Sequence, residues 1–220
     1  MQFTDNLVFP GEHQVLLQGL VGPLEAVISI PENPRFAHVA FLGHPHSLQG
    51  GTMNNKVVTT MARVFKELGI PSLRLNFRGV GQSAGEYNAG IGESADLLLL
   101  AKEWQNKFPQ AQFFFAGFSF GSYVTYRCAA QFGPSSLISI APPVHHYDYH
   151  EFQPDPKPWL IVQGNDDEVV PANLVIDFAK EATPPIKLIP FAKTTHFFHG
   201  KLVELKDQLL NYVSSEVITS

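Results

Sequence analysis

Only one cysteine, Cys128, occurs among the 220 residues, and this excludes an internal disulfide framework. Its place on the apolar side of a predicted helix favours a core side chain over a reactive thiol. Long hydrophobic runs are also lacking, because no window reaches the roughly 18 apolar residues that a membrane-spanning helix needs. Residues 1–6 have neither the basic start nor the apolar run of a signal peptide. We therefore expect a cytoplasmic protein with no membrane partner.

Charged residues are scarce as well, at 16% of the chain, and neither sign gathers in one place. The net charge of -5 comes from basic and acidic residues that are interspersed, so no basic patch for nucleic acid is expected. Apolar residues are plentiful, at 45%, which is enough for a substantial core in a single domain over residues 1–220. The sequence does not indicate the oligomeric state.

The hydrophobic pattern predicts strands and helices that alternate along most of the chain. Residues 6–17 and 20–30 alternate loosely around turns and predict an antiparallel hairpin at a sheet edge. The expected strands after it are residues 36–42, 70–77, 111–116, 135–140, 159–163 and 186–191, and the expected helices are residues 53–68, 93–108, 122–132, 171–182 and 199–217.

This order of elements predicts an α/β fold with a mostly parallel, doubly wound sheet and helices on both faces. Ligands of such sheets bind beyond the carboxyl ends of the strands. Candidate functional residues are therefore sought in the loops that follow strands.

The most informative of these loops is the G-x-S-x-G pattern at residues 117–121, directly after an apolar strand. The pattern indicates a sharp strand-to-helix turn with Ser119 exposed at its apex in a strained backbone conformation. Gly117 and Gly121 are then required, since a Cβ at either position would collide with a neighbouring strand or helix.

Two further loops supply the partners that a serine nucleophile needs. A hydroxyl attacks well only when an imidazole accepts its proton, and a carboxylate must orient that imidazole. Asp167 follows the strand at residues 159–163, and His196 follows the strand at residues 186–191. Ser119, Asp167 and His196 are the predicted catalytic residues, with Asp166 as a possible substitute for Asp167. His199 could compete with His196, but we place it in the first turn of the last helix.

These motifs resemble the α/β hydrolases, whose triad has the order nucleophile, acid, histidine. Residues 164–171 match the family's G-x-x-D-x-x-V-P loop, and residues 76–83 are similar to the loop after its fourth strand. His44-Pro45-His46 followed by residues 50–53 resembles small, lidless bacterial serine hydrolases near the dienelactone hydrolase branch. That branch often has cysteine at the elbow, whereas this chain has serine.

The resemblance implies an α/β-hydrolase fold with no sizeable cap, and an oxyanion hole made of two backbone N–H groups. One N–H should come from Phe120. By analogy with the family, the other should come from His46, with Ser47 as second choice, because Pro45 has no N–H. The loop that contains Arg78 holds other loops together in this family.

Other histidines have separate interpretations. His44 is expected to support its loop by hydrogen bonds. His145, His146 and His150 could bind zinc together with His44 and His46, but they lie where hydrolases place a lid. We interpret that segment as pocket wall and predict no metal. Because residues 142–158 are too few for a helical cap, the site should be open.

The sequence thus predicts a serine hydrolase that cleaves a small carboxylic ester or thioester and needs no cofactor. Phe118, Tyr147 and Tyr149 are the expected substrate-binding residues. Two alternatives stay open: a metal hydrolase built from the histidine cluster, and a ligand-binding protein without catalysis on a hydrolase fold. The physiological substrate and its acyl-chain length are not readable from the sequence.

Overall fold

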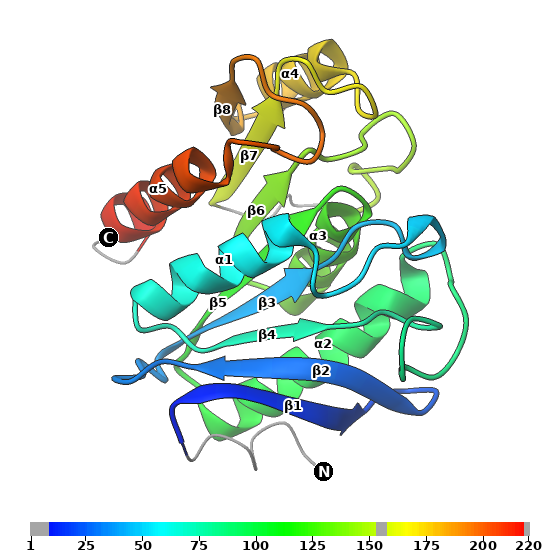
Figure 1. The fold of residues 1–220 in the computed structure, drawn as a ribbon, viewed down its shortest axis with the longest axis vertical. Helices are drawn as coiled ribbons and strands as arrows, with labels where there is room; N and C mark the ends of the chain where they lie inside the picture. The colour runs from blue at the N-terminus through cyan, green and yellow to red at the C-terminus, as the bar shows by residue number, and fades with distance from the viewer. Residues whose placement is uncertain (1–8, 153–157, 218–220) are drawn as a thin grey trace.

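The computed structural model describes residues 9–152 and 158–217, and in them eight strands form one sheet (Figure 1). The strand order is β1-β2-β4-β3-β5-β6-β7-β8. The strands are β1 (Gly11–Gln18), β2 (Pro23–Ile30), β3 (His38–Gly43), β4 (Ser72–Leu75), β5 (Gln112–Phe118), β6 (Ser136–Ile140), β7 (Trp159–Gly164) and β8 (Lys187–Phe191).

The predicted hairpin and the predicted parallel sheet are both confirmed. β1 pairs antiparallel with β2 from Gly11 opposite Ile30 to Gln18 opposite Pro23. β2 in turn pairs antiparallel with β4, and every pairing from β4 to β8 is parallel. Residues 6–8 of the predicted hairpin lie outside the described residues. The six parallel strands all present their carboxyl ends at one edge of the sheet.

Helices cover both faces of this sheet (Figure 1). One face carries α1 and α5, and the other carries α2, α3 and α4. The helices are α1 (Lys56–Glu67), α2 (Ile91–Lys107), α3 (Phe120–Phe132), α4 (Ala172–Glu181) and α5 (Leu202–Tyr212), with a short 3₁₀ helix η2 (Ser47–Gln49) and a π-helical turn η3 (Val213–Val217).

The last helix begins three residues later than the sequence pattern predicted. Phe198 and Gly200 have positive φ angles of 54° and 72°, which are incompatible with a continuous α-helix. α5 therefore starts at Leu202, and His199 lies exposed in the turn before it rather than in its first turn.

Two apolar cores lie on opposite sides of the central strands. Along β5, Phe113 and Phe115 point to the side of α2 and α3, while Phe114 and Ala116 point to the side of α1 and α5. This alternation explains why the strand sequence is apolar throughout, since each face is covered. Cys128 belongs to the first core, and complete burial raises the pKa of its thiol well above the ordinary value.

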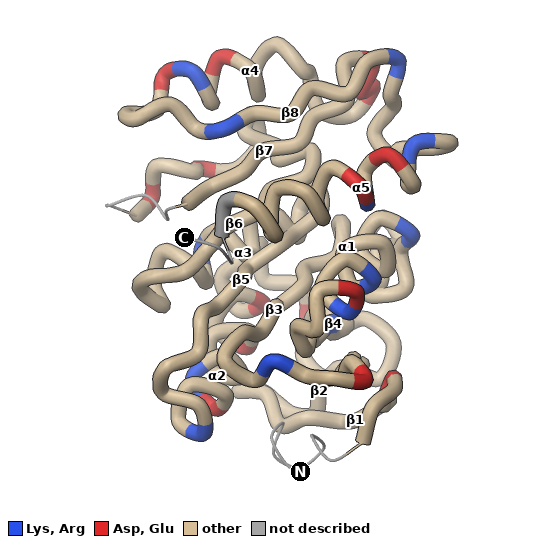
Figure 2. The backbone as a smooth tube through the Cα atoms, turned by 90° about the vertical axis from the view of Figure 1, so that its left-hand side faces the viewer, with Lys and Arg blue, Asp and Glu red and all other residues tan. Residues whose placement is uncertain are grey.

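Charged residues gather on the helices and loops, and both signs are interspersed (Figure 2). β5, β6 and β7 carry no Lys, Arg, Asp or Glu. In the part of the chain that the structure describes, no helix is long and apolar enough to cross a membrane.

The turn between β5 and α3 has the strained backbone that the G-x-S-x-G pattern predicted, but Ser119 is only 8% exposed, not the exposed residue that we expected. Ser119 has φ 54° and ψ -126°, a backbone conformation that costs a non-glycine residue about 1–3 kcal/mol. A Cβ on Gly117 would collide with the Gly121 carbonyl, and a Cβ on Gly121 would collide with the backbone of Gly43 in β3. α3 begins at Phe120 rather than at Ser122, because the chain enters the helix immediately after the turn.

His44 supports the loop after β3, as predicted. Its side chain is fully buried, Nδ1 donates to the Pro45 carbonyl at 2.6 Å, and Nε2 accepts from the Phe77 N–H at 2.9 Å. Burial lowers the pKa of His44 from 6.5 to about 4. The ring is therefore neutral at pH 7, with one nitrogen as donor and the other as acceptor.

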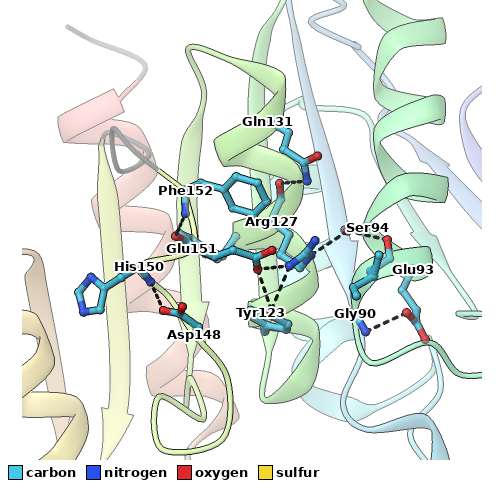
Figure 3. Close-up of polar contacts among 12 residues, drawn as sticks. Gly90, Glu93, Ser94, Tyr123, Arg127, Gln131, Asp148, His150, Glu151 and Phe152 are labelled. Atoms are coloured by element: carbon cyan, nitrogen blue, oxygen red, sulfur yellow. Dashed lines mark hydrogen bonds and ion pairs between the residues drawn. The ribbon is translucent and has the colours of Figure 1, made fainter.

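The segment after β6 is fastened to α3 (Figure 3). The Glu151 carboxylate accepts hydrogen bonds from the Tyr123 hydroxyl and from the Arg127 guanidinium, which also donates to Ser94 Oγ of α2. The Arg127 guanidinium packs on the Phe152 ring, with its Cζ atom 5.2 Å from the centroid of that ring. The described residues of this segment form turns and no helix. Residues 153–157 of the predicted insertion lie outside the described part.

The contact between α3 and β3 predicts that Gly121→Ala destabilises the fold by about 3 kcal/mol or more, since the new methyl group meets rigid backbone. Gly50→Ala is the matched control. Its Cβ would meet open space, so only its left-handed backbone, with φ 78° and ψ 14°, opposes the substitution, at about 1 kcal/mol. Urea unfolding of both variants checks the difference, and equal losses would contradict the close approach.

The buried neutral His44 predicts a specific dependence of stability on pH. Its folded pKa lies below its unfolded value, so the unfolded chain binds more protons between pH 6.5 and 4. The free energy of unfolding should fall by about 3 kcal/mol as pH drops through that range. His44→Gln should be less stable at pH 7 but show a flatter curve, whereas His150→Gln should keep the wild-type slope. Parallel curves for His44→Gln and wild type would contradict this assignment.

Candidate active site

The loops after β5, β7 and β8 bring the three predicted catalytic residues to one edge of the sheet. Ser119 follows β5, Asp167 follows β7 and His196 follows β8. These three parallel strands, with β6 among them, are neighbours in the sheet, so the loops at their carboxyl ends converge.

Ser119 lies at the N-terminus of α3 and faces the two cavities of this edge. Its N–H donates to the Ile140 carbonyl at 2.8 Å, which ties the turn to the end of β6. Ser122 Oγ donates to the Ser119 carbonyl at 2.6 Å, and the Tyr149 hydroxyl lies 2.7 Å from Ser122 Oγ. Since the Ser122 hydrogen is already used, Tyr149 is the donor to Ser122.

The His196 ring is held by a carboxylate. His196 Nδ1 lies 2.8 Å from Oδ2 of Asp167, and both side chains are almost completely buried. Nδ1 must carry the hydrogen of this bond, because an ionised carboxylate only accepts. Nε2 is then left unprotonated in the neutral ring and can accept a proton at the cavity.

Asp167 uses both oxygens. Oδ1 accepts from the N–H groups of Val169 and Val170 at 2.9 and 2.7 Å, and Oδ2 also accepts from Nε2 of Gln163 at 3.1 Å. Burial alone would raise the pKa of the Asp167 carboxyl, but the hydrogen bonds from His196 and from the two backbone amides lower it below its ordinary value. The carboxylate is therefore ionised and fixed in position.

Asp166 and Glu168 flank this carboxylate but act differently. Asp166 is exposed, and its N–H donates to the Thr194 carbonyl. The hydrogen bond to the His196 ring is made by Asp167. Glu168 Oε2 accepts the backbone N–H of His196 at 3.1 Å, a contact that the sequence analysis did not anticipate.

Gln163 was also missed, although the sequence contains a signal for it. It is the polar residue of the otherwise apolar run in β7, four positions before Asp167, and it is fully buried. A buried amide needs partners, and a carboxylate in the next loop is one.

Ser119 and His196 line the same cavity of about 90 Å³. In the described part of the chain no hydrogen bond joins the Ser119 hydroxyl to the His196 ring. Catalytic hydrogen bonds often tighten only when substrate is bound, so the absence of this bond is compatible with proton transfer from Ser119 to His196.

Of the two N–H groups predicted for an oxyanion hole, one belongs to the residue after Ser119 in the chain. The other belongs to a residue that lines the same cavities as Ser119. Phe120 is the first residue of α3, where backbone N–H groups lack partners within the helix. His46 lines both cavities with Ser119. Its carbonyl accepts from Gln49 and Gly51, while its N–H has no hydrogen-bond partner among residues 9–152 and 158–217.

A larger cavity of about 380 Å³ is also lined by Ser119. Phe120 and Tyr147 form part of its wall, together with Pro143 and Val170. Phe118 and Tyr149 do not line either cavity beside Ser119, contrary to expectation. Phe118 is fully buried in the α1 and α5 core, where it packs against the His196 ring. Tyr149 is buried against α3, where it bonds to Ser122. Both therefore support residues of the site without lining a cavity.

The exposed histidines near the cavity make no visible metal site. His145 and His146 stack on one another at 3.9 Å, and His150 packs on Phe178 at 5.3 Å. Within residues 9–152 and 158–217, no group of three or more His, Cys, Asp or Glu side chains could hold a metal ion.

Arg78 has the structural role that the resemblance implied. Its Nε donates to Oδ2 of Asp96 at 2.6 Å, which joins the loop after β4 to α2.

A third groove, of about 500 Å³, lies far from these residues. It is lined by side chains such as Arg63, Lys66 and Lys206 of α1 and α5, and by Gly69 ahead of β4. None of the predicted site residues takes part in it.

Comparisons with known proteins agree with this fold. A crystal structure from Xanthomonas campestris, described as an α/β serine hydrolase without lid, is 41% identical with a TM-score of 0.88 and covers 95% of this chain and 97% of its own. An α/β serine hydrolase homologue from Coxiella burnetii is 41% identical with a TM-score of 0.87, covering 94% and 99%. An uncharacterized protein of Rickettsia prowazekii is 32% identical over 91% of this chain and 88% of its own length. No family model matches the sequence.

A more distant solved structure shows similarity of the fold alone. Dienelactone hydrolase from Anabaena variabilis shares the fold at 14% identity, with a TM-score of 0.70 and coverage of 93% and 97%. The identity and coverage of the Xanthomonas and Coxiella proteins are high enough to define a family, and this chain belongs to the α/β serine hydrolases without a lid.

Proposed function

We propose that the protein is a carboxylesterase-like serine hydrolase with Ser119 as nucleophile. The observation that carries the proposal is the shared cavity. Ser119, held in a strained turn, opens into the same 90 Å³ space as His196, whose other ring nitrogen is fixed by Asp167. A hydroxyl that faces a cavity, an oriented imidazole and a buried carboxylate are the parts that acyl transfer through a covalent intermediate needs.

The reaction proceeds in two halves on these residues. Ser119 Oγ attacks the ester carbonyl carbon while Nε2 of His196 takes the hydroxyl proton. The C–O bond of the tetrahedral intermediate then breaks, and His196 returns the proton to the departing alcohol. Water repeats the sequence on the acyl-enzyme, releasing the acid and restoring Ser119. Asp167 stays ionised and stabilises the charged imidazolium between the transfers.

The negative charge on the carbonyl oxygen needs donors that are already in place. Phe120 N–H and His46 N–H are the proposed pair, supported by the free helix N-terminus and by the unpartnered His46 amide described above. The N-terminal end of α3 adds a favourable dipole at the same point. No cofactor is required by this scheme, and the proposed substrate is a small-molecule ester or thioester.

Ser119→Ala should abolish hydrolysis of p-nitrophenyl acetate and labelling by a fluorophosphonate, while the thermal unfolding midpoint stays close to that of the wild type. The reason is that the methyl group removes the nucleophile and leaves the turn intact. Ser135→Ala is the control, because Ser135 is equally little exposed, at 8%, but precedes β6 at the opposite end of the sheet. Normal turnover in Ser119→Ala would disprove the assignment.

Asp167→Asn should lower kcat by about 10²- to 10⁴-fold, since a neutral amide neither holds the Nδ1 tautomer nor stabilises the imidazolium. Asp166→Asn tests the adjacent carboxylate and should keep kcat within about twofold, because Asp166 is exposed and does not contact His196 in the described structure. Steady-state kinetics on one ester distinguishes them. The reverse ranking would make Asp166 the acid.

A further inference from the structure

Two cavities of very different size meet at Ser119. His46, Gln49 and Val169 line both of them. The larger cavity, about 380 Å³, is roughly four times the volume of the smaller, about 90 Å³. A bound ester has two arms, one on each side of its carbonyl carbon, and the two cavities at Ser119 differ in the size of the arm that each can hold.

His196 distinguishes the two sides, because it lines the small cavity and is absent from the wall of the large one. In the proposed reaction, His196 must hand its proton to the oxygen of the departing alcohol. A general acid has to be within hydrogen-bond reach of the atom that it protonates. The alcohol arm is therefore assigned to the small cavity, which His196 lines, and the acyl arm is assigned to the large cavity.

The small cavity leaves little room, at about 90 Å³. Residues of the turn 45–51 line it, and this turn is closed by hydrogen bonds from the Gln49 and Gly51 N–H groups to the His46 carbonyl, both at 3.0 Å. The Phe197 side chain, which is 41% exposed, also lines the cavity beside His196, at 5.1 Å between ring centroids. This side suits a methyl or ethyl group better than a ring.

The large cavity has an apolar part of its lining, made of Phe120, Pro143, Tyr147 and Val170, and a polar part that includes His46, Gln49, His145 and His146. The Tyr147 ring is packed against Phe120 at 5.5 Å and against Tyr123 at 4.6 Å, so the aromatic wall is fixed by its neighbours. Rigid aromatic walls favour a flat or bulky apolar group.

We propose that the enzyme is selective for esters that join a bulky apolar acid, such as an aryl-substituted one, to a small alcohol. The acyl group occupies the cavity of Phe120 and Tyr147, and the alcohol occupies the cavity of His196 and Phe197. The assignment rests on the proposed serine hydrolase reaction and adds to it the orientation of the substrate.

Two isomeric esters test the orientation directly. Methyl phenylacetate and benzyl acetate contain the same atoms, but the ring is on the acyl arm of the first and on the alcohol arm of the second. We expect kcat/KM for methyl phenylacetate to exceed that for benzyl acetate by about tenfold or more, which is the usual range for a group that a pocket accepts against one that it excludes.

A pair of ring deletions separates the two cavities. Phe197→Ala should raise kcat/KM for benzyl acetate, because it enlarges the cavity assigned to the alcohol. The ratio of kcat/KM for methyl phenylacetate to kcat/KM for benzyl acetate should therefore fall. Tyr147→Ala should lower kcat/KM for methyl phenylacetate and should not raise that for benzyl acetate. A gain for benzyl acetate with Tyr147→Ala, or none with Phe197→Ala, would overturn the assignment of the cavities.

Fluorophosphonate labelling of Ser119 distinguishes failure of this inference from failure of the reaction. If the probe labels Ser119 but benzyl acetate is cleaved equally well or better, or neither ester is cleaved, the serine hydrolase stands and the selectivity is overturned. If Ser119 is not labelled and neither ester is cleaved, both the reaction and the selectivity are overturned.

Discussion

The structure depends on the close approach of three backbone segments at Gly43, Gly117 and Gly121. No side chain separates β3, β5 and the first turn of α3 there. This contact sets the angle at which the chain turns, and the turn sets the positive φ of Ser119. The same contact places the N-terminus of α3 beside the loop that begins at His44. The strained turn at Ser119, the N-terminus of α3 and the position of the His46 amide thus all follow from the packing of three glycines.

Buried side chains of the core support the site, in addition to the loops that carry it. Phe118 packs under the His196 ring, and Tyr149 reaches the Ser119 carbonyl through Ser122. Gln163 and two backbone amides surround the Asp167 carboxylate. Phe118, Tyr149 and Gln163 are buried, so none of these side chains can relax toward solvent without losing its packing or a hydrogen bond. The network leaves Ser119 and His196 facing the same cavity, as the proposed reaction requires.

The layered fold and the convergence of Ser119, Asp167 and His196 could be predicted, because strand order and loop position follow from local patterns that the sequence contains. The start of α5 could not, since the positive φ of Phe198 carries no sequence signal. Phe118 and Tyr149 were assigned to the pocket because aromatic residues near an elbow look alike in sequence. Whether a ring points into a cavity or behind it depends on packing from distant segments, here α1, α3 and α5.

The burial of Cys128 in α3 has a practical consequence for labelling experiments on this protein. Its thiol is inaccessible and its ionisation is suppressed by the surrounding core, so maleimides find no reactive thiol on the folded protein. The wild-type chain should therefore stay unlabelled by thiol-specific probes. A cysteine introduced on the exposed segment that follows β6 would accept a single fluorophore or spin label, and its signal would report the movements of that segment alone.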